Sequence, residues 1–117
     1  MENIKEIMKI LTDPVFSSPI RIGVLLALAG VDKITFTKLP KYLEVNKSTL
    51  SVNLKILESY GLTEIKTRFF SDRPREVIKI TDNGKKLVEK YLEAISKYKK
   101  IINSKNELNK QDITKDK

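Results

Sequence analysis

The stretch Asn46–Thr63, NKSTLSVNLKILESYGLT, reads as a helix with one side committed to a core and one side left free. Leu50, Leu54 and Leu57 recur at spacings of four and three, so they share one face of a helix. The hydrophobic core of the protein should cover that face. The opposite face carries no acidic side chain, which leaves it available for a different kind of contact.

The two ends of this helix are also defined by the sequence. Asn46 is a good N-cap, because its side-chain oxygen can accept hydrogen bonds from the unpaired backbone N–H groups of the first turn. Gly61 can adopt the left-handed conformation that ends a helix, and Leu62 can then pack back onto the last turn. The helix is therefore predicted to have fixed boundaries.

The free face combines small hydroxyl side chains with two lysines. Small side chains would let the backbone approach a DNA groove, and Ser, Thr and Asn reach base edges and phosphates. An ordinary amphipathic surface helix is the alternative that this composition leaves open. The residues predicted to contact DNA are Lys47, Ser48, Thr49, Ser51, Val52, Asn53 and Lys55.

Residues 43–62, LEVNKSTLSVNLKILESYGL, resemble the second half of the winged helix-turn-helix of MarR- and ArsR-type transcriptional regulators. The family's leucine, glutamate, glycine and leucine run is matched by Leu57, Glu58, Gly61 and Leu62. The resemblance spans residues 19–100. It implies an α+β, mainly α fold: a winged helix-turn-helix with a long C-terminal dimerisation helix. Val52 departs from the family, in which arginine is frequent at this place, so guanine readout there is doubtful.

Two helices are predicted before this unit. Apolar residues recur with helical spacing from about Asn3 to Thr12, and Asp13-Pro14 should end that helix. Ser18 is expected to cap a second helix with Pro19 at its first position, a favoured place for proline. That helix is apolar almost all round, which marks it as the central buried helix. Gly23 is expected to allow the close approach of a neighbour, and Gly30 is expected to close the helix.

A short extended piece and a third helix should follow. Lys33–Phe36 is predicted to be extended, and Thr37 to cap a helix that runs to about Leu43. In the resembling family this is the first helix of the helix-turn-helix. Relatives often have glycine where Glu44 stands, so either the turn differs here or Glu44 accepts a strained backbone.

After Glu64 the pattern changes to alternation, which predicts two strands joined by the turn cluster SDRPR at residues 71–75. The resemblance makes this hairpin the wing. Its bases could meet phosphate, and Arg73 is the best candidate for a minor groove. The alternative is that these bases serve only solubility. The predicted wing contacts are Lys66, Arg68, Arg73 and Arg75.

The last helix carries a surplus of apolar residues. The spacings of three, four, three and four are those of a coiled-coil seam, and they join Val88, Tyr91, Ile95, Tyr98 and Ile102. A second subunit is expected to cover this seam in a twofold dimer. Packing within one chain is the alternative. The predicted interface comprises Ile4, Ile7, Leu11, Val88, Tyr91, Leu92, Ile95, Tyr98 and Ile102. Residues 1–102 should form a single domain, and residues 103–117 a disordered or frayed basic tail.

Composition narrows the function classes. The 117 residues carry a net charge of +8, of which +5 lies between Lys33 and Lys79, and this favours polyanionic partners. The chain has no cysteine and no histidine, which removes thiol nucleophiles, imidazole bases and the commonest metal ligands. We therefore predict no enzyme, no metal and no cofactor. No apolar run approaches a membrane span, so a cytoplasmic protein is expected.

The expected function rests on the resemblance, which implies a homodimeric DNA-binding transcriptional regulator. Its partners would be double-stranded DNA and a second copy of the chain, with two recognition helices in successive major grooves and the wings on the backbone or minor groove. The alternative is a non-specific architectural or protein-interaction module. Relatives often bind an effector between the dimer helices and the DNA-binding unit, but the sequence identifies no ligand.

Overall fold

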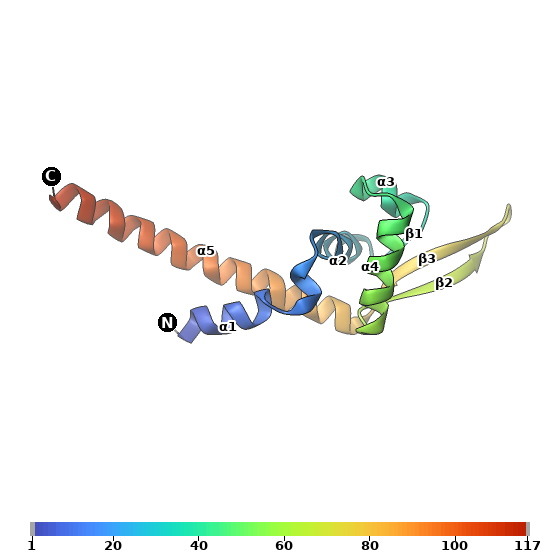
Figure 1. Ribbon diagram of the computed structural model, residues 1–117, viewed down its shortest axis with the longest axis horizontal. Helices are drawn as coiled ribbons and strands as arrows, with labels where there is room; N and C mark the ends of the chain where they lie inside the picture. The colour runs from blue at the N-terminus through green and yellow to red at the C-terminus, as the bar shows by residue number, and fades with distance from the viewer. Residues whose placement is uncertain (1, 117) are drawn as a thin grey trace. The chain divides into compact units, whose positions relative to one another are not determined.

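The computed structural model describes residues 2–116, with side chains for residues 4–105. It is mainly helical with one small antiparallel sheet, as predicted. The chain forms two compact units, Asp13–Glu89 and the pair of segments Met1–Thr12 and Lys90–Lys117. Figure 1 shows the elements in chain order.

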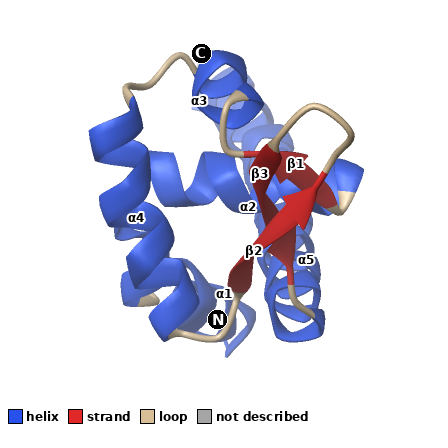
Figure 2. Cartoon of the chain, turned by 90° about the vertical axis from the view of Figure 1, so that its right-hand side faces the viewer, coloured by secondary structure: helices blue, strands red, loops and turns tan. Residues whose placement is uncertain are grey.

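The Asp13–Glu89 unit contains most of the elements. They are the 3-10 helix η1 (Pro14–Ser17), the helices α2 (Pro19–Val31), α3 (Lys38–Leu43) and α4 (Lys47–Ser59), the strands β1 (Lys33–Thr35), β2 (Thr63–Phe69) and β3 (Pro74–Ile80), and the start of α5 (Asp82–Asp116). The sheet order is β1-β3-β2, with both pairs antiparallel. Figure 2 shows the strands beside the helices of this unit.

The core of this unit joins α2, α4 and the sheet. Leu50, Leu54 and Leu57 of α4 are completely buried, which confirms the predicted leucine face. From α2, the core receives Val24, Leu25 and Leu28, and from β3 it receives Ile78 and Ile80. Burying a side chain of this size stabilises the folded state by about 1.5–3 kcal/mol. The leucine face therefore fixes how α4 sits in its unit.

Several predicted helix ends are confirmed. Ser18 caps α2 by accepting from the N–H of Arg21, and Pro19 occupies the first position. At the start of α4, the Asn46 side chain accepts from the N–H of Thr49 at 2.8 Å. The turn before α4 keeps its expected length because Glu44 takes the left-handed conformation (φ 56°, ψ 43°). Of the two alternatives for this turn, the strained Glu44 is the one observed.

Other boundaries differ from the prediction. Helix α2 does not close at Gly30 but continues to Val31, and Asp32 (φ 68°) caps it by donating its N–H to the carbonyl of Leu28. Thr37 stands at the N-cap of α3 but makes no side-chain cap bond; the Thr35 hydroxyl accepts from the N–H of Lys38 instead. Asparagine and aspartate accept a positive φ more readily than most other residues. Asp32 can therefore do here what glycine was expected to do.

The glycine that allows the close approach of a neighbour is Gly84 rather than Gly23. A Cβ at Gly23 would meet the Leu43 side chain at 3.6 Å, an ordinary contact. At Gly84 a Cβ would collide with the backbone carbonyl of Leu62. Thr81 strengthens the same junction, since its hydroxyl donates to the Gly61 carbonyl at 2.6 Å and accepts from the Gly84 N–H at 3.0 Å. The start of α5 is thus held against the end of α4.

The second unit consists of α1 (Glu2–Leu11) and the remainder of α5. Ile7 and Ala94 are both about 2% exposed. Helix α5 continues to Asp116, where the sequence predicted a disordered or frayed tail from residue 103. No proline or glycine follows Gly84, so nothing in this polar segment interrupts helical hydrogen bonding. The side chains beyond Lys105 lie outside the described residues.

Candidate nucleic-acid interface

The outward face of α4 presents most of the residues predicted to contact DNA. Lys47, Ser48, Val52 and Lys55 are exposed, and Thr49 and Ser51 are half-buried. Ser48, Val52 and Lys55 lie opposite the buried leucines, Thr49 and Ser51 lie at the borders of that open side, and Lys47 is exposed in the first turn. Lys47 is the first residue of the helix, where unpaired backbone N–H groups add positive charge. The face can therefore offer short hydrogen-bonding groups and two cations to one partner.

Asn53 does not belong to that face. It is only 8% exposed, and its Oδ1 accepts from Arg21 Nη1 at 3.0 Å and from Ser18 Oγ at 3.2 Å. Its Nδ2 donates to the carbonyl of Thr49 at 2.9 Å. The predicted role in base reading does not fit this placement, because the amide is already engaged inside the protein. Position 53 lies three residues after Leu50, on the flank of the buried face.

Arg21 extends this network to the segment that precedes α2. Its Nε donates to the carbonyl of Val15 at 3.0 Å, and its Nη2 donates to the carbonyl of Pro14 at 3.0 Å and to Ser17 Oγ at 2.8 Å. One guanidinium group therefore joins η1, α2 and α4. The sequence did not predict η1 or this network, because the partners of Arg21 are distant in sequence or are backbone carbonyls.

The four wing cations differ in how available their charges are. Lys66 lies 3.7 Å from Glu64, and Arg75 makes a 2.6 Å ion pair with Asp72. The hydrogen bond from Arg75 lowers the pKa of the Asp72 carboxyl, which keeps this partner ionised. The Arg75 guanidinium also lies 5.4 Å from the centre of the Phe70 ring. Within the described residues, Arg68 and Arg73 have no ion-pair partner, so they are the better candidates for phosphate.

The start of α4 and the tip of the wing meet at one cavity. It has a volume of about 360 Å³ and includes Lys47 from α4 and Arg73 from the wing among its lining residues. The remaining lining residues are Phe36, Thr37, Pro74, Arg75 and Glu76. Three of the seven are basic and one is acidic. The geometry therefore brings together a helix lysine and a wing arginine that the sequence analysis assigned to separate elements.

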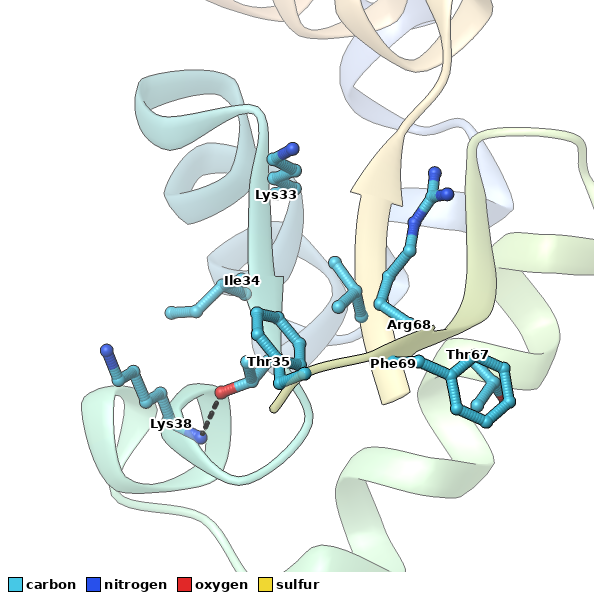
Figure 3. Close-up of a pocket in the computed structure, with 9 residues that line it drawn as sticks. Lys33, Ile34, Thr35, Lys38, Thr67, Arg68 and Phe69 are labelled. Carbon is cyan, nitrogen blue, oxygen red and sulfur yellow. Dashed lines mark hydrogen bonds between the residues drawn. The ribbon is translucent and has the colours of Figure 1, made fainter. Parts of the chain in front are cut away.

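A larger open cavity of about 860 Å³ lies between β1 and the wing (Figure 3). Its cations are Lys33, Lys38 and Arg68. The other lining residues are Ile34, Thr35, Thr67, Phe69, Phe70 and Val77. In the sequence, Lys33 and Lys38 stand out only through their contribution to the local net charge. Their joint position depends on the pairing of β1 with β3, which brings residues 33–35 to residues 77–79.

The residues predicted to form a dimer interface fall into three groups. Ile7 and Val88 are buried within this chain, so they are not available to a partner. Ile4, Leu11 and Tyr91 are half-buried. A row on α5 remains exposed by 39–50%: Leu92, Ile95, Tyr98 and Ile102. The periodicity revealed the apolar face of α5 but could not tell which of its residues the same chain would cover.

In the described part of the chain, no group of three or more His, Cys, Asp or Glu side chains could hold a metal ion. No described helix is both long and apolar enough to span a bilayer.

Comparison with known proteins places this geometry in a family. A model of the winged helix DNA-binding domain matches residues 20–99. Uncharacterized protein MJ0432 of Methanocaldococcus jannaschii is 31% identical over 88 residues, which cover 75% of this chain and 96% of that protein.

Solved structures also resemble this chain, and two of them are transcription regulators or their homologues. The transcriptional regulator homologue protein from Pyrococcus horikoshii OT3 is 33% identical, with a TM-score of 0.67 over 89% of this chain and 97% of that one. MepR, a transcription regulator of the Staphylococcus aureus multidrug efflux pump MepA, is 25% identical, with a TM-score of 0.68 over 97% of this chain and 85% of its own. The outward face of α4 and the cationic hairpin agree with these matches, which show that the chain belongs to the winged helix DNA-binding domain family.

Proposed function

We propose that this protein is a transcriptional regulator that binds double-stranded DNA with α4 in the major groove. The observation that carries the proposal is the division of α4 into a completely buried leucine face and an exposed face that carries no acidic group before Glu58, in the last turn. Serine and threonine hydroxyls can reach base edges, and the exposed Val52 can contact a thymine methyl group. The reading set is Lys47, Ser48, Thr49, Ser51, Val52 and Lys55.

The wing would supply much of the electrostatic attraction. Arg73 and Lys47 line the same cavity, so a phosphate that approaches the start of α4 would meet cations from both elements. Arg68 would add a further contact, while the charge of Arg75 is partly compensated by Asp72. Contacts to phosphate position a protein on DNA and make its affinity depend on salt. The wing is thus proposed to lie on the backbone or in the minor groove.

The protein would act as a homodimer through α5. Leu92, Ile95, Tyr98 and Ile102 form an exposed apolar row, and a twofold axis would place the rows of two copies against each other. Such a dimer would carry two copies of α4. In helix-turn-helix dimers the two half-sites lie about 34 Å apart, one turn of the double helix. A palindromic site is therefore expected.

The proposal is tested by comparing two duplexes of equal length. One comes from the region upstream of the protein's own gene, and the other has random sequence; each is titrated at about 50 and 200 mM salt. A specific regulator should prefer one site by about a thousandfold or more and protect a palindromic footprint. Equal and steeply salt-dependent binding would instead identify a non-specific architectural protein. Absence of binding to either duplex would contradict the proposal.

A further inference from the structure

The tip of the wing has two chemically different faces. In the antiparallel pair of β2 and β3, Phe69 lies opposite Pro74, and Arg68 lies opposite Arg75. Residues directly opposite each other share a face of a sheet, and successive residues alternate. Phe69 and Pro74 therefore form an apolar pair on one face, and Arg68 and Arg75 lie on the other. This apolar pair is called the wing wedge below.

Phe69 is 84% exposed, more than any other large apolar side chain in the described part of the chain. Figure 3 shows its ring directed away from β1 and Lys38, on a different side of β2 from Arg68. The adjacent Phe70 differs, because its ring is in contact with the guanidinium group of Arg75. The hydrophobic effect disfavours an exposed ring of this size, so the position of Phe69 points to an external partner.

The surroundings of the ring limit the chemistry of that partner. Arg68 lies on the opposite face of the hairpin tip and Arg73 lies in its turn, so a partner that surrounds the tip must accept cations as well as an apolar ring. A duplex offers both, since phosphates line the minor groove and stacked bases form its floor. Proteins that enter this groove frequently insert Phe or Pro between base steps, which unstacks the step and kinks the duplex.

We infer that the wing wedge inserts into a base step of the minor groove and bends the DNA, with Phe69 as the inserting residue. The inference rests on the proposed function, since it assigns a role to the same wing. It adds a source of sequence preference that no hydrogen bond supplies, because flexible pyrimidine–purine steps are the easiest to unstack. The arginines would hold the tip in the groove while the ring occupies the step.

The experiment uses the full chain and a duplex of about 30 base pairs, selected by the wild-type protein from a random-sequence pool. Dyes at the two ends report bending through energy transfer. 2-Aminopurine, placed in turn at each adenine of the site, reports unstacking as a rise in fluorescence. The wild-type protein should increase energy transfer and raise the fluorescence at one step in each half-site.

Phe69→Ala should still bind but lose both signals, with affinity lower by about tenfold and an unchanged salt slope, because a ring releases no counterion. Phe69→Leu, which keeps an apolar wedge, should retain part of the bend. Phe70→Ala, the matched control on the other face, should retain the unstacking signal. Because Phe69 is exposed, the alanine variant should melt at the wild-type temperature.

The inference would be overturned by a wild-type complex that is specific but neither bent nor unstacked. It would also be overturned if Phe69→Ala bent the duplex as the wild type does, which is the outcome expected if the ring serves a protein partner. Failure of the wild type to select any duplex would contradict the proposed function as well, so the two failures are distinguishable.

Discussion

Helix α4 and the wing hairpin both belong to the proposed DNA interface, yet they are held in opposite ways. Helix α4 is anchored by three completely buried leucines, a side-chain cap and the amide of Asn53. The hairpin is buried only at its base, and β2 is exposed from Lys66 to Phe69. The helix carries short polar groups at fixed places, while the hairpin carries charge on an exposed arm. Direct reading of bases is therefore assigned to the helix, and the electrostatic attraction to the cations of the hairpin.

The largest expected effect is on the free energy of unfolding, through the buried leucines that anchor α4. Leu54→Ala removes a completely buried side chain and should lower the free energy of unfolding by about 2–5 kcal/mol. Phe69→Ala removes a larger but exposed side chain and should change it by no more than about 0.5 kcal/mol. Urea denaturation followed by circular dichroism measures both values. Similar losses in the two variants would mean that the hairpin is anchored as firmly as the helix.

The next effect concerns the dimer that would set the spacing of two α4 helices. Ile95→Glu places a charge in the exposed row of α5 and should weaken self-association by about thirtyfold or more, since a buried unpaired charge is costly. Ser104→Glu adds the same charge on the opposite face of α5 and should leave the dimer intact. Sedimentation velocity distinguishes the two. An undisturbed dimer in Ile95→Glu would place the interface elsewhere.

A smaller effect is expected from the polar anchor of α4. Asn53→Ala removes the acceptor of the Arg21 hydrogen bond and should cost about 1–3 kcal/mol of stability. Asn53→Asp keeps an acceptor for the guanidinium group and should preserve most of the stability. Thermal melts compare the variants. A wild-type melting temperature in Asn53→Ala would show that the network does not hold the helix.

The smallest effect is expected in the wing. Arg73→Ala should weaken DNA binding almost uniformly across sequences and lower the salt slope by about one, because one phosphate contact is lost. Arg75→Ala should lower the slope less, since Asp72 already compensates its charge. Fluorescence anisotropy over a range of salt concentrations gives both slopes. An unchanged slope in Arg73→Ala would remove this arginine from the interface.

The sequence predicted best those features that depend on local chemistry. The cap at Asn46, the proline at the start of α2 and the left-handed Gly61 (φ 72°) were all found where expected. Each depends on residues within one turn of a helix. The two strands of the wing followed from alternation and a turn cluster. The resemblance to the MarR and ArsR families then supplied the order of these elements.

The features that sequence could not provide depend on distant partners. Asn53 has the side chain of a base-reading residue, and only the position of Arg21 reveals that its amide is engaged. Val88 and Ile95 share one apolar periodicity, but only Val88 is covered by its own chain. Arg75 and Arg73 look equivalent in the sequence, and the ion pair to Asp72 separates them. In each case the missing information was a contact.

The central claim is that the side chains of α4 read bases directly while the arginines of the wing supply charge. The most direct test measures the ratio of affinities for the selected and random duplexes, over a range of salt, in Arg73→Ala and in the double variant Ser48→Ala, Val52→Ala. The account predicts that the wing variant keeps the ratio and loses salt slope, while the helix variant keeps the slope and loses the ratio. This claim would be contradicted if Arg73→Ala lost the ratio of affinities and the double variant of α4 kept it.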